Sequence, residues 1–183
     1  TNPTKSNSGG VTLILTAYER HGKTRNLTVS DVTNPDFQQW LGTFIRAASN
    51  QADSTGTLMK EMVLKGPSSF DALCVYENLA IDFLENAKGR WGELHITYPP
   101  VNMWNDNPYY ILNASWVSDD QRQAATAFLE FLMSERIQKE ALSHGFRPGN
   151  PNIAINGPDS KFVKYAKYGI QIELKGMCQP PAA

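Results

Sequence analysis

The loop Ser6-Asn7-Ser8-Gly9-Gly10 and the apolar run Val11-Thr12-Leu13-Ile14-Leu15 behind it decide how this chain is organised. Serine and asparagine oxygens accept hydrogen bonds from backbone amides at helix starts, and paired glycines let the backbone pass close to a neighbour. We therefore expect the loop to lead directly into a helix. The first N–H groups of a helix lack partners, and its dipole adds partial positive charge there. The stretch predicts either an ordinary helix cap or a binding site for a carboxylate, sulfate, phosphate or sugar hydroxyl.

The composition indicates a globular protein with no electrostatic attraction to polyanions. The chain has 183 residues, of which 41% are hydrophobic and 19% are charged, so it is long enough for one core or two small lobes. Its 17 Lys and Arg against 18 Asp and Glu give a net charge of −1. This balance disfavours nucleic acid and anionic membranes as partners.

The cysteines and histidines show no metal-ligand spacing, so we expect neither a metal nor a cofactor. Cys74 lies in an apolar run and is expected to be buried, and two free thiols are favoured over a disulfide between Cys74 and Cys178. No apolar run approaches the ~20 residues that a membrane span needs, and the first residues carry no secretion signal. The chain is expected to be either cytoplasmic or stripped of a leader. Its start at Thr1, in a polar turn, favours a processed or excised segment.

Apolar residues recur with the helical period in five parts of the chain. The predicted helices cover residues 8–21, 34–45, 54–65, 79–88 and 118–144. Ser134 and Glu135 are expected to interrupt the last one, and one more short helix is expected in the tail. Shorter apolar runs over residues 71–76, 94–98 and 108–114 read as strands. Alternating helices and strands predict an α/β fold with a largely parallel sheet.

Polar and aromatic residues follow the ends of these predicted strands. In an open α/β sheet ligands bind beyond the carboxyl ends of strands, so Tyr76, Asn78, Asn102 and Trp104 could converge with the Ser6–Gly10 loop. Each has a structural alternative: Tyr76 as core, Asn78 as a helix cap and Trp104 as a wedge between lobes. Arg147 is expected to pair with a carboxylate or with carbonyls.

The residues offer little for catalysis. Ser6 and Ser8 are candidate nucleophiles, but neither lies in a G-x-S-x-G elbow and no histidine is identified as their base. Glu77 could form an acid/base pair with Asp71 or Asp82, although solvated or capping carboxylates are favoured. Nucleotide-binding glycine motifs are absent. We therefore expect a protein that is not an enzyme.

Three passages carry a family resemblance: residues 1–9, residues 75–78 and, most specifically, residues 124–151 with their Gly145-Phe146-Arg147-Pro148 exit. Together they resemble bacterial extracellular solute-binding proteins of ABC importers, in the branch with the type II periplasmic-binding-protein fold. The resemblance implies a two-lobed clamp that holds a ligand without chemistry. It implies a mostly parallel sheet flanked by helices, plus a C-terminal helical segment.

In that family the opening segment begins the second lobe. Residues 1–98 would then form the second lobe, and residues 99–183 would return to the first lobe with the long helix 118–144 and the tail. The N-terminal part of the first lobe would be missing, so the chain is expected to be a fragment. Its return segment would leave apolar surface that is covered by oligomerisation or by altered packing.

The resemblance also implies partners, a location and a site. Expected partners are a small-molecule or oxyanion ligand and the membrane permease of an importer, with the chain lying extracytoplasmically, in the periplasm or at the cell surface. The implied ligand-binding residues are Ser6, Asn7, Ser8, Gly9, Tyr76, Asn78, Asn102 and Trp104. Two alternatives remain: a ligand-sensing regulatory or receptor module, which uses the same fold, and a serine hydrolase acting through Ser6 or Ser8.

Overall fold

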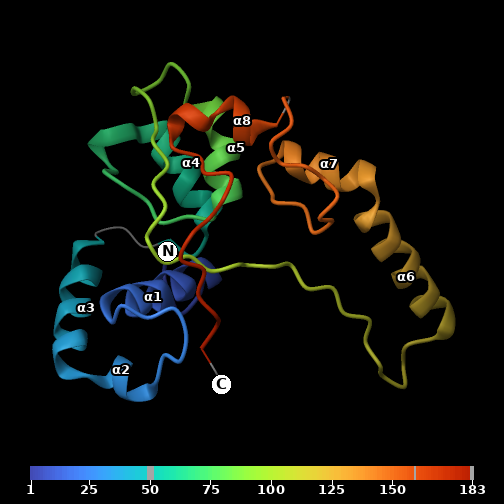
Figure 1. Cartoon of the computed structure of the whole chain (residues 1–183), viewed down its shortest axis with the longest axis horizontal. Helices are drawn as coiled ribbons and strands as arrows, with labels where there is room; N and C mark the ends of the chain where they lie inside the picture. Colours follow the sequence, from blue (N-terminus) through green and yellow to red (C-terminus); the bar gives the residue numbers. More distant parts are fainter. Residues whose placement is uncertain (49–51, 159, 182–183) are drawn as a thin grey trace.

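Helices carry the regular structure of this computed structural model, which describes residues 1–48, 52–158 and 160–181 (Figure 1). The α-helices are α1 (Asn7–Arg20), α2 (Val29–Thr33), α3 (Pro35–Ala47), α4 (Thr55–Lys65), α5 (Glu77–Ala87), α6 (Asp119–Met133), α7 (Glu135–Ser143) and α8 (Lys161–Lys164). Two short 3-10 helices, η1 (Gly66–Ser68) and η2 (Ala166–Tyr168), complete them.

The expected α/β fold, with its periplasmic-binding-protein-like parallel sheet, is wrong. The described part of the chain is half helical with 1% strand and no sheet. Residues 71–76, 94–98 and 108–114 belong to no strand, and the one isolated bridge among the described residues pairs Asn102 with Met177 in parallel. An apolar run becomes a strand only where a neighbouring strand pairs with its backbone and other elements cover its faces. The local pattern cannot supply that neighbour.

The helix predictions are largely confirmed, because caps and periodic apolar residues act locally. Helices α1, α3, α4 and α5 lie within two residues of the expected bounds. The predicted interruption is also confirmed, since Ser134 has extended backbone between α6 and α7. The short α2, which begins with a capping box between Thr28 and Asp31, is not among the predicted helices.

In the described parts of the chain, three small apolar clusters take the place of a single large core. The first joins α5, α7 and α8 through Ile81, Leu84, Leu142, Ile153, Phe162 and Ile170. A second forms around the fully buried Tyr18 with Val101 and Cys178. The third holds α4 against α5 through Met59, Val63 and Ala87. The third cluster joins α4 to α5, and hydrogen bonds between Ser8 and Thr55 and from Asn7 to Tyr76 place the start of α1 in the same body of the protein (Figure 1).

The C-terminal tail crosses the chain at Asn102, just before residues 104–117 lead away from the body. Asn102 donates its amide to Gly176 O at 2.9 Å and accepts at its carbonyl from the amide of Cys178 at 2.7 Å. Gly176 has φ +64°, and a Cβ there would lie 1.8 Å from Pro100 O, so only glycine fits. Cys178 is buried, whereas Cys74 is exposed, so the expected burial of Cys74 is wrong; both thiols are free.

Residues 104–117, which we call the arm, lead away from the body to the start of α6, and α6 returns toward it (Figure 1). No residue of α6 is buried. Helix α7 rejoins the body through Leu142, which belongs to the first apolar cluster. We call the arm and α6 together the limb.

Candidate functional site

A cluster of hydroxyl groups lies where α1 and α4 begin. Ser8, in the first turn of α1, has only 4% of its surface exposed. Its Oγ lies 2.8 Å from Thr1 Oγ1 and 2.9 Å from Ser6 Oγ, and it also contacts Oγ1 of Thr55, the first residue of α4. Thr55 is buried as well. We call Thr1, Ser6, Ser8 and Thr55 the hydroxyl cluster.

The hydrogens of the hydroxyl cluster outnumber the contacts within it. Four hydroxyls carry four hydrogens, and the contacts among them are the three around Ser8 Oγ. A hydroxyl can donate once and accept twice. At least one of the outer hydroxyls therefore has a hydrogen that no contact within the cluster uses, and this hydrogen can be donated to a ligand oxygen.

Asn7 connects this cluster to the start of α5. Its Nδ2 donates to Tyr76 Oη at 2.9 Å and to Asn105 Oδ1 at 3.2 Å. Tyr76 is the N-cap residue of α5, and Asn105 lies in the arm. Since Tyr76 Oη accepts here, its own hydrogen remains a donor with no acceptor among the described residues. Side chains from the starts of α1, α4 and α5 thus meet in one place.

Two of these helix starts leave their backbone amides uncapped. Neither α1 nor α5 has a side-chain hydrogen bond to its first-turn amides. In contrast, Asn34, Ser54 and Ser118 cap α3, α4 and α6 in this way. Ser6 occupies the N-cap position of α1, but its hydroxyl bonds to Ser8 Oγ instead. The first-turn amides of α1 and α5 therefore have no side-chain cap, which leaves helix-start N–H groups without a side-chain acceptor among the described residues.

Gly9 fixes the path of the chain beneath the site. A Cβ at this position would lie 2.7 Å from Thr1 O and 2.8 Å from Pro3 Cα, both of which are backbone atoms. The N-terminal turn therefore packs directly on the first turn of α1, and this contact holds the Thr1 hydroxyl against Ser8.

The charges nearest in sequence to the hydroxyl cluster compensate one another. Lys5 Nζ lies 3.1 Å from Asp53 Oδ2, and both side chains are more than half exposed. The pair links the residue before Ser6 to the residue before the α4 cap Ser54. The groups that face a ligand are thus neutral hydroxyls, amides and backbone N–H groups.

An ion pair between Arg147 and Glu77 stabilises the start of α5. Arg147 binds the carboxylate of Glu77, the first residue of α5, and donates to the carbonyls of Gln171 and Ile172 at 2.6 Å each. The expectation that Arg147 pairs with a carboxylate and with carbonyls is confirmed. Tyr98 Oη donates to Glu77 Oε1 at 2.5 Å, and burial together with this carboxylate raises the pKa of Tyr98 above its usual range. Burial works to lower the pKa of Arg147, but the Glu77 carboxylate outweighs it and raises that pKa.

The structure brings together some of the predicted site residues and separates the others. Ser6, Asn7, Ser8, Gly9 and Tyr76 meet at the hydroxyl cluster.

The remaining three have other surroundings. Asn102 donates its side-chain amide to Pro99 O and Lys175 O and holds the tail. The Trp104 ring is exposed, and the Arg147 guanidinium lies 5.8 Å from its centroid. Asn78 lies within α5 and is not its cap, since Tyr76 occupies that position.

Sequence reasoning left three contributors out of the predicted set: Thr1, Thr55 and Asn105. A signal existed for Thr55, because Ser54-Thr55-Gly56 repeats the hydroxyl-and-glycine pattern of the first helix start. Asn105 follows Trp104 directly in the sequence, but nothing in the local pattern assigns it to the site. No local signal identifies Thr1, which reaches Ser8 only through the fold of the N-terminal turn.

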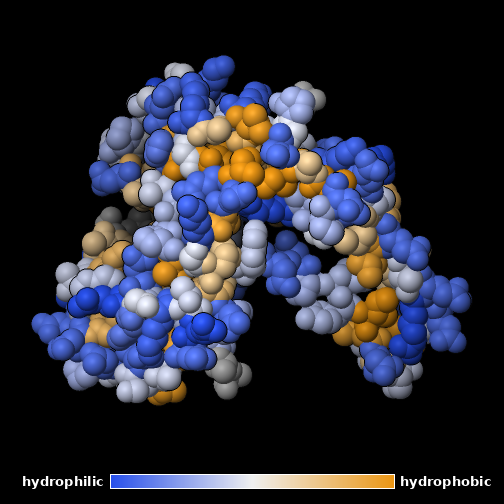
Figure 2. All heavy atoms as spheres, in the orientation of Figure 1, coloured by the Kyte–Doolittle hydropathy of each residue, from blue (hydrophilic) through white to orange (hydrophobic). Residues whose placement is uncertain are grey.

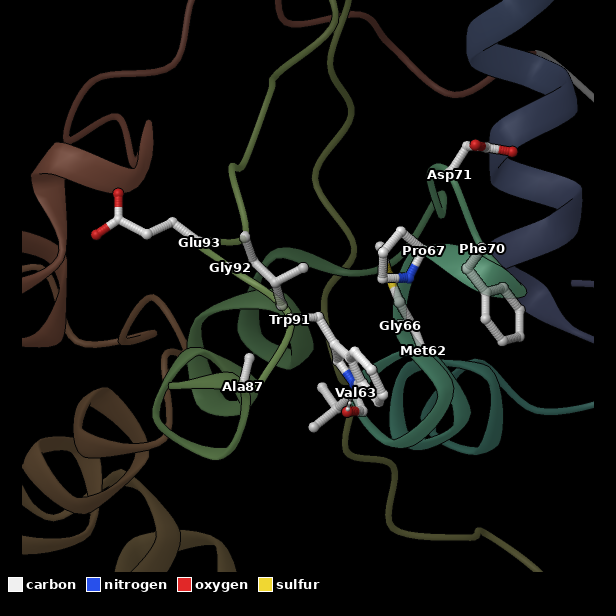
Figure 3. A pocket seen from close by; sticks show the side chains of 11 residues that line it. Met62, Val63, Gly66, Pro67, Phe70, Asp71, Ala87, Trp91, Gly92 and Glu93 are labelled. Carbon is white, nitrogen blue, oxygen red and sulfur yellow. Dashed lines mark hydrogen bonds between the residues drawn. The ribbon is translucent and has the colours of Figure 1, made fainter. Parts of the chain in front are cut away.

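Two pockets elsewhere in the described part of the chain are smaller than the ~300–1,000 Å³ typical of ligand pockets. One pocket of about 180 Å³ lies between the end of α4 and residues 91–94 (Figure 3). Trp91 closes it by donating Nε1 to Val63 O at 3.0 Å, while the carboxylates of Asp71 and Glu93 point away from it (Figure 3). The other, of about 240 Å³, lies beside Glu85, Lys164 and Tyr165, which bond to one another.

The described residues hold neither a metal-ligand cluster nor a membrane-spanning helix. Among residues 1–48, 52–158 and 160–181, no group of three or more His, Cys, Asp or Glu side chains is placed to hold a metal ion. Within the same ranges, no helix has the length and apolar character needed to cross a membrane.

Comparison with known proteins yielded no relative: no family model, no curated protein and no solved structure matches this chain.

Proposed function

We propose that this protein captures a small, oxygen-rich solute at the hydroxyl cluster without chemically altering it, in the manner of an extracytoplasmic binding protein for import or sensing. One observation carries the proposal. The buried Ser8 hydroxyl is surrounded by three others that keep a spare donor hydrogen, beside the uncapped starts of α1 and α5. The membrane permease of an importer would be the partner of the loaded protein.

The donor set supports an oxyanion or a sugar as the ligand. Neutral N–H and O–H donors at helix starts favour negative charge through the helix dipole, without a dedicated basic residue. Hydroxyl and amide groups also match sugar hydroxyls, which both donate and accept. The exposed Asn7, with Tyr76 and Asn105 as its partners, provides the polar edge of the site.

The surroundings of the two candidate serine nucleophiles support binding over catalysis. A serine nucleophile needs an adjacent general base. Ser6 and Ser8 contact only hydroxyls in the described side-chain hydrogen bonds, apart from the Ser8 carbonyl that accepts from Thr12. If a hydrolytic rate did exist, its loss when both serines are replaced by alanine would favour the serine hydrolase alternative.

The test is a thermal-shift screen against phosphate, sulfate, molybdate, sugars and amino acids, followed by calorimetry of any hit. A ligand that binds only the folded state raises the melting temperature. Ser8→Ala and Asn7→Ala should weaken binding of the hit at least tenfold. Asn102→Ala is the control, because that side chain holds the tail and lies outside the cluster, so it should retain the wild-type affinity.

Two results would contradict the proposal. One is the absence of any shift with every class of compound. The other is a hit whose affinity falls with Asn102→Ala but not with Ser8→Ala or Asn7→Ala. Melting temperatures of each variant are compared with its own unliganded value, so that a change in stability is not mistaken for a change in binding.

A ligand-sensing module is the second candidate, and the Asn7–Asn105 contact favours it. A ligand that takes the Asn7 amide hydrogen would compete with Asn105 Oδ1, the contact that joins the arm to the site. Ligand binding should then increase amide exchange in residues 104–117. Unchanged exchange with a bound ligand would leave simple capture as the function.

A further inference from the structure

The limb exposes an apolar surface that the proposed solute site does not use. The exposed residues are Tyr109, Tyr110, Ile111, Leu112, Trp116, Phe128, Phe131 and Met133. Part of the surface is an ordered stack, in which the Tyr109 and Phe128 rings lie 6.2 Å apart and the Phe128 and Phe131 rings also lie 6.2 Å apart. In the space-filling view, orange on the limb marks only the aliphatic and phenylalanine part of this surface, because tyrosine and tryptophan take paler colours on the hydropathy scale used (Figure 2).

The summed exposed apolar area of the limb is larger than the largest apolar patch of a typical monomer. With roughly 150–250 Å² for an aromatic side chain and about 100 Å² for an aliphatic one, the exposed fractions of these eight residues amount to about 700 Å². The largest apolar patch of a monomer is about 300–600 Å². A standard interface buries about 800 Å² on each partner.

The backbone of the arm is prepared for pairing along one edge. In an extended chain, the N–H and C=O groups of residues two apart point to the same edge. On one edge, Leu112 O accepts from Arg122 Nη1 of α6 at 3.2 Å. On the other, the backbone groups of Tyr109, Ile111 and Asn113 form no hydrogen bond within the described parts of the chain. An unpaired edge of this kind is a template for another strand.

The side chains of the arm show the alternation of a strand that is covered on one face only. Tyr109 and Ile111 are 36% and 38% exposed, and Tyr109 Oη donates to Ala125 O of α6 at 2.9 Å. Tyr110 and Leu112, on the opposite face, are 80% and 57% exposed. Helix α6 thus covers one face of the arm, while the other face and the odd-numbered edge stay open.

We infer that the open edge is occupied by a second copy of this chain, with the two arms paired antiparallel about a two-fold axis at Ile111. This register places Tyr110 opposite Leu112 of the other copy and Tyr109 opposite Asn113, so the most exposed apolar side chains of the two arms contact one another side by side on one face. Pro108, which has no N–H to donate, lies just outside the five-residue paired stretch. A net charge of −1 per chain gives little repulsion between the copies.

Sedimentation equilibrium over a range of protein concentrations tests the inference. The wild type should approach twice its mass of 20.4 kDa. Ile111→Pro removes the central N–H of the free edge, and proline favours extended backbone at the preceding residue, so the arm keeps its conformation. This variant should be monomeric with unchanged helical circular dichroism. Tyr110→Lys should weaken the dimer at least tenfold, because it puts a charge on the open face.

Val29→Lys is the matched control, since Val29 is an exposed apolar residue on α2, outside the limb. It should dimerise as the wild type does. A wild type that is monomeric at every concentration would overturn the inference. The exposed surface of the limb would then be a binding site for a different protein. Open-ended aggregates that persist in Ile111→Pro would also overturn it.

A cross-link tests the register directly. In a Cys74→Ser background, Ile111→Cys should form a disulfide-linked dimer under mild oxidation, because paired Cα atoms lie about 5.5 Å apart across an antiparallel pair, within disulfide range. Val29→Cys in the same background should not. Equal cross-linking at both positions would show random collision and contradict the proposed pairing.

Discussion

Arg147 binds the Glu77 carboxylate in a bidentate ion pair, with Nε 2.7 Å from Oε2 and Nη2 2.8 Å from Oε1. The same guanidinium binds two carbonyls of the tail and lies 5.0 Å from the Phe162 ring centroid. One side chain therefore joins the start of α5 to α8 and the tail. This brace fixes the position of Glu77. The residue before it in the sequence is Tyr76, whose hydroxyl belongs to the candidate site.

Replacing Arg147 should destabilise the protein more than replacing any exposed cation. Arg147 and Glu77 side chains are only 14% and 20% exposed, so Arg147→Met leaves a partly buried carboxylate and two carbonyls without their donor. We expect a loss of about 2–3 kcal/mol in the free energy of unfolding, measured with urea.

Lys139→Met is the control for that measurement, since it removes an exposed pair with Glu135 within α7. It should change the stability by less than about 0.5 kcal/mol. Adding Glu77→Gln to Arg147→Met should recover part of the loss, because the unpaired charge is then gone. A loss in Arg147→Met no larger than in Lys139→Met would refute the bracing role.

The acid sensitivity of the fold should depend in part on Glu85. Hydrogen bonds from Tyr165 and Lys164 lower the pKa of Glu85 from 4.5 to about 2. A carboxyl whose pKa is lower in the folded state stabilises that state above its unfolded pKa, and the contribution disappears as the pH falls through the folded value. The stability difference between wild type and Glu85→Gln should therefore be full above pH 4.5 and vanish near pH 2.

Urea unfolding at a series of pH values would measure this difference. Glu130→Gln provides the control, because Glu130 lies on α6 and forms no ion pair among the described residues. A Glu85→Gln difference that stays constant between pH 5 and pH 2 would contradict the assigned hydrogen bonds.

Gly9 and Gly10 should respond in opposite directions to alanine. A Cβ at Gly9 would lie 2.7–2.9 Å from backbone atoms of Thr1 and Pro3, so Gly9→Ala should displace the N-terminal turn and cost about 1–3 kcal/mol. At Gly10 the nearest atom is Pro3 O at 3.8 Å, an ordinary contact. Gly10→Ala should therefore stabilise α1 by about 0.5–1 kcal/mol. Thermal unfolding of both variants measures this, and equal effects would contradict the close approach at Gly9.

The two cysteines should differ in reactivity toward a thiol reagent. Cys74 is exposed, whereas Cys178 is buried and its pKa is raised by that burial. In the native protein, one thiol should react with the reagent quickly and the second only slowly. In the unfolded protein, both thiols should react quickly. Cys74→Ser should remove the fast phase. Two fast equivalents in the native state would place Cys178 on the surface.

The candidate site could be predicted only where it rests on local sequence. Ser6, Asn7 and Ser8 are next to one another in the chain, and the helix start they form follows from capping and periodicity. Tyr76 is predicted from its place at the end of an expected strand; no strand is present there, but Tyr76 is the N-cap residue of α5 and its hydroxyl accepts from Asn7. Thr55 and Asn105 could not be assigned, because their contacts with the first turn of α1 span 47 and 98 residues.

By itself, the sequence determined the helices. Their caps, apolar periods and breaks act over a few residues, so the start of α1 at Asn7 and the interruption at Ser134 could be predicted. Whether the apolar runs at 71–76, 94–98 and 108–114 pair into a sheet was decided only in the tertiary structure, where they pair into none. The reason is physical: a helix satisfies its backbone within its own segment, whereas a strand depends on a neighbour that no local pattern can supply.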